Sequence, residues 1–225
     1  MISANLEQVR RRIAAAARSK GRDPAGVRLI AVTKGVPVER IREAIACGVR
    51  EIGENRVQEA KEKQAPIGRQ VRWHLIGHLQ RNKVKPAVEL FDWIHSVDSL
   101  ELVEALKRCG GERKLEVLVQ VNVSGEAAKH GCGPEEVKKL AEAVLKSGNL
   151  KLSGLMTMAP FSDDPESARP VFRQLRQLRD GIDPSLDLSM GMSHDFEVAV
   201  EEGATMVRVG TAIFGERKGV RPLLG

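Results

Sequence analysis

Aromatic residues are scarce in this sequence: Phe, Trp and Tyr make up 3% of it, and tyrosine is absent. Proteins that hold single-stranded nucleic acids stack the bases on exposed aromatic rings. The formal net charge of +6 favours anionic partners. Because a stacking surface is missing, we attribute this charge to solubility and to one small anionic ligand, and we expect no nucleic-acid partner.

Cysteine is also scarce, and the three cysteines include no CxxC pair. Cys47, Cys109 and Cys132 form an odd, scattered set that resembles neither a disulfide framework nor a zinc motif. We therefore expect no metal site and a cytoplasmic protein.

Long apolar runs are missing as well, and no stretch is long enough to span a membrane. The N-terminal segment "MISANLEQVRRRIAAAARSK" mixes arginines with apolar residues at Leu6, Val9, Ile13 and Ala16. This spacing predicts an amphipathic helix rather than a signal peptide. We expect no membrane partner, and we expect a monomer because the predicted surface helices show no apolar seam.

What the sequence does contain is an uninterrupted alternation of short β-branched runs and helical patterns. The eight runs are residues 27–34, 50–55, 71–79, 93–97, 115–123, 150–159, 186–193 and 206–215. Eight such units in a chain of 225 residues predict a (β/α)8 TIM barrel of the α/β class, a single domain over 1–225 with an extra N-terminal helix. An open doubly wound sheet is the alternative, but the first strand lacks the GxGxxG turn typical of that fold.

Polar residues gather where the predicted strands end, which is where barrels of this kind place their active sites. They are Lys34, Glu54, Asn55, His74, His78, His95, Ser96, Asp98, Asn122, Ser124, Thr157, Ser193, Arg208 and Thr211. Loops after the seventh and eighth strands often bind phosphate. There, Gly191 allows close backbone approach, Ser193 offers a hydroxyl, and Gly210 and Thr211 offer N–H groups. In the alternative interpretation, Ser193 is only a helix N-cap and Gly210 only a bend.

Lys34 ends the apolar run "VRLIAVTK". Desolvation at a barrel mouth lowers the pKa of a lysine, which frees its amine to form a Schiff base with a carbonyl. An ion pair with a carboxylate such as Glu54 is the alternative role. A Schiff-base lysine opposite a phosphate site indicates a phosphorylated aldehyde, either pyridoxal 5'-phosphate (PLP) or, less specifically, a sugar phosphate bound by an aldolase.

Arg208 distinguishes these two ligands. Strand alternation in "MVRVG" places Arg208 opposite Val207 and Val209, so it points into the barrel if the valines meet the outer helices. An arginine facing the ring nitrogen of PLP would keep that nitrogen unprotonated and weaken the ring as an electron sink.

The sequence resembles the YggS/PROSC family of PLP-binding, PLP homeostasis proteins almost from end to end. The matching stretches are "AVTKGVP", "IGENRVQE", "WHLIGHLQRNK", "SVDS", "VNVSGEAAKHG", "GLMTMAP", "SMGMSHD" and "RVGTAIFGER". This family is similar to the N-terminal barrel domain of alanine racemase, without the additional β-domain of that enzyme. At Cys132 the family usually has an apolar residue.

The resemblance implies a role for each residue of the candidate PLP site. Lys34 is then the Schiff-base lysine, Arg208 the neighbour of the pyridine nitrogen, and Asn55 a residue beside the ring. Ser193, Gly210 and Thr211 are then the phosphate ligands. We interpret His74 as a core histidine and His78 as a loop histidine.

Two functions fit these residues. The resemblance implies a PLP carrier acting in vitamin B6 and amino-acid homeostasis, with PLP-dependent apo-enzymes as possible recipients and no catalytic residue. The alternative is a PLP-dependent amino-acid racemase. Racemisation needs a base on each face of the substrate, and this chain has no tyrosine to supply the second one. We therefore predict PLP binding without robust turnover.

Overall fold

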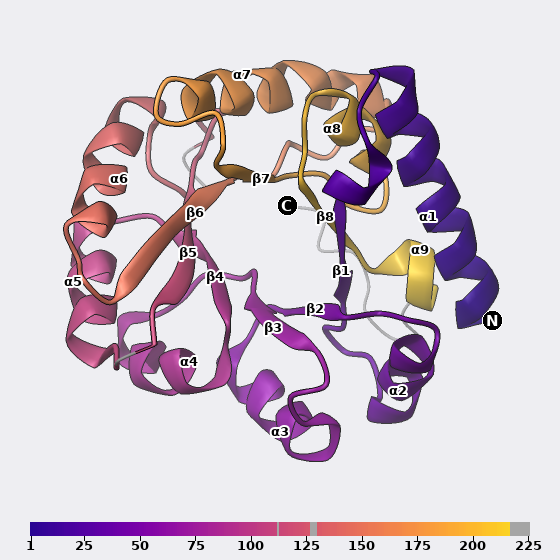
Figure 1. Ribbon diagram of the computed structural model, residues 1–225, viewed down its shortest axis with the longest axis horizontal. Coiled ribbons are helices and arrows are strands. Elements are labelled where there is room, and N and C mark those ends of the chain that lie inside the picture. The colour runs from indigo at the N-terminus through magenta and orange to yellow at the C-terminus, as the bar shows by residue number, and fades with distance from the viewer. Residues whose placement is uncertain (112, 127–129, 217–225) are drawn as a thin grey trace.

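Eight parallel strands close into a barrel in chain order, with β8 beside β1 (Figure 1). The structure is a computed structural model and describes residues 1–111, 113–126 and 130–216. The strands are β1 (Arg28–Val32), β2 (Glu51–Glu54), β3 (Arg72–Leu75), β4 (Trp93–Val97), β5 (Leu115–Gln120), β6 (Leu150–Met156), β7 (Asp187–Ser189) and β8 (Met206–Val209). Helices cover the outside, so both faces of the sheet are buried and its strands read as apolar runs. The predicted barrel is confirmed.

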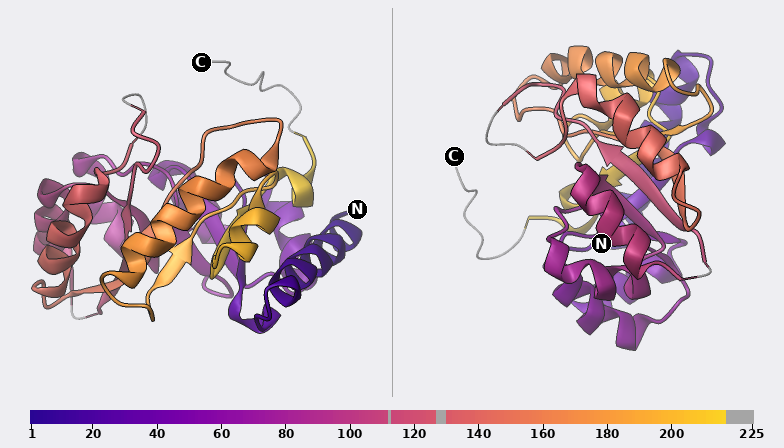
Figure 2. Two further views of the ribbon diagram at one scale, coloured as in Figure 1. Left: turned by 90° about the horizontal axis from the view of Figure 1, so that it is seen from above. Right: turned by 90° about the vertical axis from the view of Figure 1, so that its left-hand side faces the viewer.

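The helices form a ring around the strands, as Figures 1 and 2 show. They are α1 (Ile2–Ser19), α2 (Val38–Ala46), α3 (Val57–Ile67), α4 (Val84–Leu90), α5 (Leu100–Cys109), α6 (Val137–Leu145), α7 (Arg169–Asp180), α8 (Phe196–Glu201) and α9 (Thr211–Phe214), with short 3-10 turns η1 (Pro24–Gly26), η2 (Arg81–Lys83), η3 (Pro134–Glu136) and η4 (Pro165–Ala168). Within the described residues, no helix is both long enough and apolar enough to cross a membrane.

The predicted N-terminal helix is present as α1, which packs on α2, α8 and α9 next to the junction of β1 and β8 (Figure 1). Its predicted apolar face is buried: Leu6, Val9, Ile13 and Ala16 all lie in the main core. On the neighbouring side, Arg12 donates two hydrogen bonds to the Glu197 carboxylate, at 2.8 and 2.6 Å. The helix therefore covers apolar surface that α2, α8 and α9 would otherwise expose.

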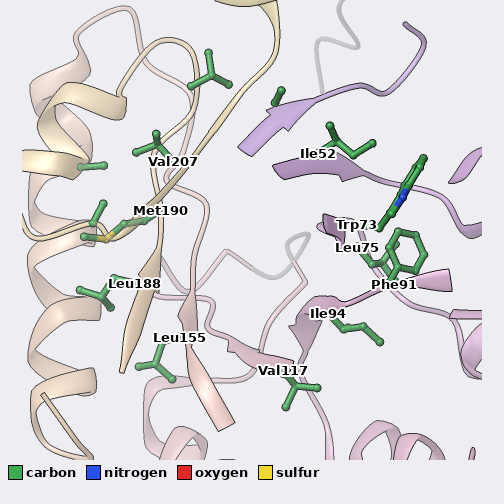
Figure 3. Close-up of a cluster of buried hydrophobic side chains, with 14 of the residues drawn as sticks. Ile52, Trp73, Leu75, Phe91, Ile94, Val117, Leu155, Leu188, Met190 and Val207 are labelled. Atoms are coloured by element: carbon green, nitrogen blue, oxygen red, sulfur yellow. The ribbon is translucent and has the colours of Figure 1, made fainter. Parts of the chain in front are cut away.

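Strand alternation separates two cores. Residues such as Ile52, Leu188 and Val207 point outward into the large cluster between the sheet and the helices (Figure 3). Their strand neighbours point into the barrel, where the apolar residues form a second cluster: Ile30, Trp93, Leu118, Met156 and Met206. The barrel interior is thus filled by side chains, and any polar group in it must find its partner there.

Several predicted strands extend beyond the observed ones: the runs at 71–79, 115–123, 150–159 and 186–193 end as strands at Leu75, Gln120, Met156 and Ser189. The eighth predicted strand, 206–215, is too long, because the chain turns at Gly210 and residues Thr211–Phe214 form α9. In α6, Val137, Leu140, Ala141 and Val144 are buried on one face of the helix. Leu145 is 65% exposed because it is the last residue of the helix, beyond the covered face.

Candidate functional site

Lys34 lies in a tight turn directly after β1 and is half-buried. Val36 N–H donates to the Thr33 carbonyl at 2.9 Å, and Gly35 adopts a φ of +68°, which favours glycine. The N–H of Gly35 donates to Glu59 Oε1 on α3 at 2.5 Å. The backbone around Lys34 is therefore fixed from the side of α3.

The carboxylate of Glu54, considered above as a partner of Lys34, is held by Lys63. Glu54 Oε1 accepts hydrogen bonds from Lys63 Nζ at 2.8 Å and from Thr33 Oγ1 at 2.6 Å. Lys63 also donates to Glu59 Oε1 and to the Thr33 carbonyl, both at 2.6 Å. Burial raises the pKa of Glu54 in spite of these partners. Sequence reasoning missed Lys63, since it lies on α3 among surface-type residues.

Ser193 contacts the start of α9. Its Oγ accepts hydrogen bonds from Gly210 N–H at 3.1 Å and from Ala212 N–H at 3.4 Å. It is not the N-cap of the following helix, because Asp195 occupies that position before α8. A serine hydroxyl thus lies where two backbone N–H groups converge, at the loops after β7 and β8.

The turn after β1 and the start of α9 border the same cavity, of about 340 Å³. Gly35 lines it on one side, and Gly210 and Thr211 line it on the other. β1 and β8 are paired neighbours, with Ala31 opposite Val209, which brings these two loops together. Asn55 follows β2, one strand further around the barrel, and is half-buried.

Arg208 points into the barrel and is 3% exposed. Its Nη1 donates to Ser189 Oγ at 2.6 Å and its Nη2 to the Thr157 carbonyl at 2.8 Å. Burial among neutral partners lowers the pKa of Arg208 to about 10. The guanidinium therefore stays protonated at neutral pH and is held in one orientation.

A continuous hydrogen-bonded network, here called the barrel network, runs from Arg208 toward the amino end of β2. Ser189 Oγ contacts His95 Nδ1 at 2.9 Å, and His95 Nε2 contacts His74 Nδ1 at 2.9 Å. His74 Nε2 then contacts Glu51 Oε2 at 2.6 Å. Both imidazoles are fully buried, and burial lowers the pKa of each one. His74 is thus a core histidine, as predicted.

With Glu51 ionised and both rings neutral, the protons of the barrel network have one consistent arrangement. A carboxylate only accepts, so His74 donates from Nε2 and accepts at Nδ1. His95 then donates from Nε2 and accepts at Nδ1 from the Ser189 hydroxyl. Arg208 can only donate, which completes a network in which every member donates toward Glu51. Sequence reasoning missed Ser189 and Glu51. The one signal for them in the sequence is the alternation along β7 and β2, which predicts that their side chains face into the barrel.

Comparison with known proteins identifies the class to which this barrel belongs. The family described as "Alanine racemase, N-terminal domain" matches residues 4–218. An alanine racemase from Clostridium difficile has the same fold, with a TM-score of 0.73 at 16% identity, and this chain covers 57% of it.

Closer relatives define the family. A pyridoxal phosphate homeostasis protein from Pseudomonas aeruginosa is 48% identical over 96% of both chains, and one from Aquifex aeolicus is 45% identical over 95% of this chain and 97% of its own. The structure of PipY from Synechococcus elongatus with PLP bound is 40% identical, with a TM-score of 0.79, and the match covers 96% of this chain and 100% of PipY. This chain belongs to the pyridoxal phosphate homeostasis protein family, which confirms the resemblance described above.

Proposed function

We propose that this protein binds PLP reversibly, as a Schiff base on Lys34, and serves as a PLP carrier in B6 and amino-acid homeostasis rather than as an enzyme. The observation that carries the proposal is the cavity that Gly35 and Val36, the two residues directly after Lys34, share with Gly210 and Thr211. The turn that carries Lys34 thus lies beside a candidate phosphate loop, in a family whose members are named for PLP homeostasis.

The remaining residues suit the parts of this cofactor. Ser193 Oγ and the N–H groups converging on it are suited to the phosphate, together with Thr211. Asn55 follows β2, the strand next to β1, and in this proposal it lies beside the pyridine ring of PLP. When bound, PLP supplies an electron sink for carbanions. Arg208 faces the ring nitrogen in this proposal, and a protonated guanidinium keeps that nitrogen free of a proton.

This environment favours carriage over catalysis. Without a proton on its ring nitrogen, PLP is a weaker electron sink for carbanions. A racemase would also need a second base, and Cys132 is a poor one because burial, with Glu136 and Asp98 nearby, raises the pKa of its thiol to about 12. His74 and His95 are fully engaged in the barrel network. We expect PLP-dependent apo-enzymes to be the recipients of the cofactor.

The test is the absorbance spectrum of the purified protein with PLP, before and after borohydride. We expect a visible band that borohydride traps on Lys34, as identified by peptide mass mapping. Lys34→Ala should lose the band, whereas Lys83→Ala, which removes an exposed lysine near the barrel rim, should keep it. A wild-type protein without the band would overturn the proposed Schiff base. PLP-dependent racemisation of a common amino acid would overturn the carrier role.

A further inference from the structure

Three potential metal ligands meet at the rim of the barrel, away from the barrel network. His78 follows β3, Asp98 follows β4 and His130 follows β5, and these strands are consecutive neighbours (Figure 1). One ligand atom from each side chain lies within 4.8 Å of the others. We propose that this group, the rim triad, binds a divalent transition-metal ion such as Zn²⁺ or Co²⁺. The proposal does not depend on PLP binding.

The internal distances of the rim triad suit a shared ion better than direct contacts. His78 Nδ1 and Asp98 Oδ2 are 3.5 Å apart, which is long for a hydrogen bond. Ligands bound at about 2.0–2.2 Å to one tetrahedral ion lie roughly 3.3–3.6 Å from each other. The His78–Asp98 pair therefore already has the spacing that a bound ion requires.

The second imidazole is close enough to join this pair. The rings of His78 and His130 are stacked, with their centroids 4.0 Å apart and their planes at 9°. Both histidines are exposed, so a change of side-chain torsion can bring the nitrogen of His130 to the ion without disturbing the core. Because the ligand atoms all lie within 4.8 Å of one another, reaching the coordination spacing needs a movement of at most about 1.4 Å.

The backbone beneath the rim triad is held in place next to two of its three members, His130 and Asp98. The His130 carbonyl accepts from Gln120 Nε2 at 3.1 Å, and Cys132 N–H donates to the Gln120 carbonyl at 2.9 Å, which holds the backbone at residues 130–132 against the end of β5. After Asp98, the Ser99 hydroxyl accepts from Leu102 N–H at 3.3 Å and begins α5. Fixed backbones with adjustable side-chain tips make a partly preorganised site.

The chemistry of the ligands selects the class of ion. Imidazole nitrogens suit Zn²⁺, Co²⁺, Ni²⁺ and Cu²⁺, whereas Mg²⁺ and Ca²⁺ prefer sites made of oxygen atoms. Two neutral imidazoles and one carboxylate leave a net positive charge on a divalent ion and at least one open coordination position. The sequence predicted no metal site because these ligands come from three separate loops and form no spacing motif.

The test uses the full chain without a polyhistidine tag, stripped with EDTA and titrated with CoCl2. We expect one equivalent of Co²⁺ to produce saturable visible d–d absorption, and ZnCl2 to displace it. Asp98→Asn and His130→Ala should each weaken binding about tenfold or more. His194→Ala removes an exposed histidine outside the rim triad and should bind like the wild type. Lys34→Ala should also bind Co²⁺ like the wild type, because Lys34 is not part of the rim triad. The metal site can therefore be tested independently of PLP binding.

Two outcomes would overturn the rim triad as a metal site. One is the absence of saturable Co²⁺ absorption and of calorimetric Zn²⁺ binding in the wild type. The other is binding that survives in both Asp98→Asn and His130→Ala. Circular dichroism of each variant shows whether it is folded, and loss of fold is not expected because both histidines are exposed and Asp98 is only half-buried.

Discussion

Replacing Ser189 with alanine removes the hydroxyl that joins Arg208 to His95 inside the barrel. Ser189 is fully buried, so water cannot replace the lost group. A hydrogen bond to a charged group contributes about 1.5–3 kcal/mol and a neutral one about 1 kcal/mol. Arg208 keeps its second bond, to the Thr157 carbonyl. We therefore expect Ser189→Ala to lower the free energy of unfolding by about 2–4 kcal/mol.

Ser96 provides a matched control for this variant. It is an equally buried serine, on β4, and its hydroxyl has no hydrogen-bond partner in the part of the chain that the structure describes. Ser96→Ala removes an unsatisfied polar group together with a single oxygen atom. Because no bond is lost, we expect its free energy of unfolding to be unchanged or slightly higher than that of the wild type.

Equilibrium unfolding in urea measures both variants, followed by the fluorescence of Trp73 and Trp93, which are both buried. Similar slopes against urea would show that the variants unfold over the same surface area, so that midpoints can be compared. If Ser189→Ala and Ser96→Ala lie within about 0.5 kcal/mol of each other, the hydroxyl of Ser189 is not the link deduced from the barrel network.

Because burial lowers the pKa of His95, the unfolded state takes up a proton below about pH 6.5 that the native state does not, and stability falls as the pH decreases. His95→Gln should flatten this fall between about pH 5 and 7 by up to about 1.4 kcal/mol per pH unit. The raised pKa of Glu54 has the opposite effect on stability, and it is present in both proteins. If the free energy of unfolding in urea depends on pH with the same slope in both proteins, the reasoning is contradicted. Lys63→Met leaves the Glu54 carboxylate buried without its cation and should cost about 3–5 kcal/mol of unfolding free energy in the same assay. A Lys63→Met protein as stable as the wild type would show that Glu54 is protonated in the native state. Gly191→Ala should lose more than about 2 kcal/mol, because the glycine has a φ of +90° and a Cβ there would lie 2.5 Å from Ala199 Cβ. Gly26→Ala, where no atom lies within 4 Å, is its control, and equal melting temperatures for the two variants would refute the argument.

The sequence by itself determined the architecture, because strand and helix periodicity are local properties. The run predicted at 93–97 is β4 with the same bounds, and the N-terminal amphipathic pattern became α1 with its apolar face buried. The inward orientation of Arg208 also followed from alternation with Val207 and Val209. Strand ends were less certain: the run at 206–215 contains a turn at Gly210 that leads into α9.

Only the tertiary structure decided which polar groups meet. Parallel strands are separated in sequence by whole helices, so no spacing motif joins Glu51 to His74 or Ser189 to Arg208. The same holds for the pairing of Lys63 with Glu54 and for the loops of the rim triad. Barrel closure brings these residues close together, and burial makes a polar group without a partner costly there. Local patterns specify the strands and helices, whereas the partners of their polar side chains depend on how the sheet closes.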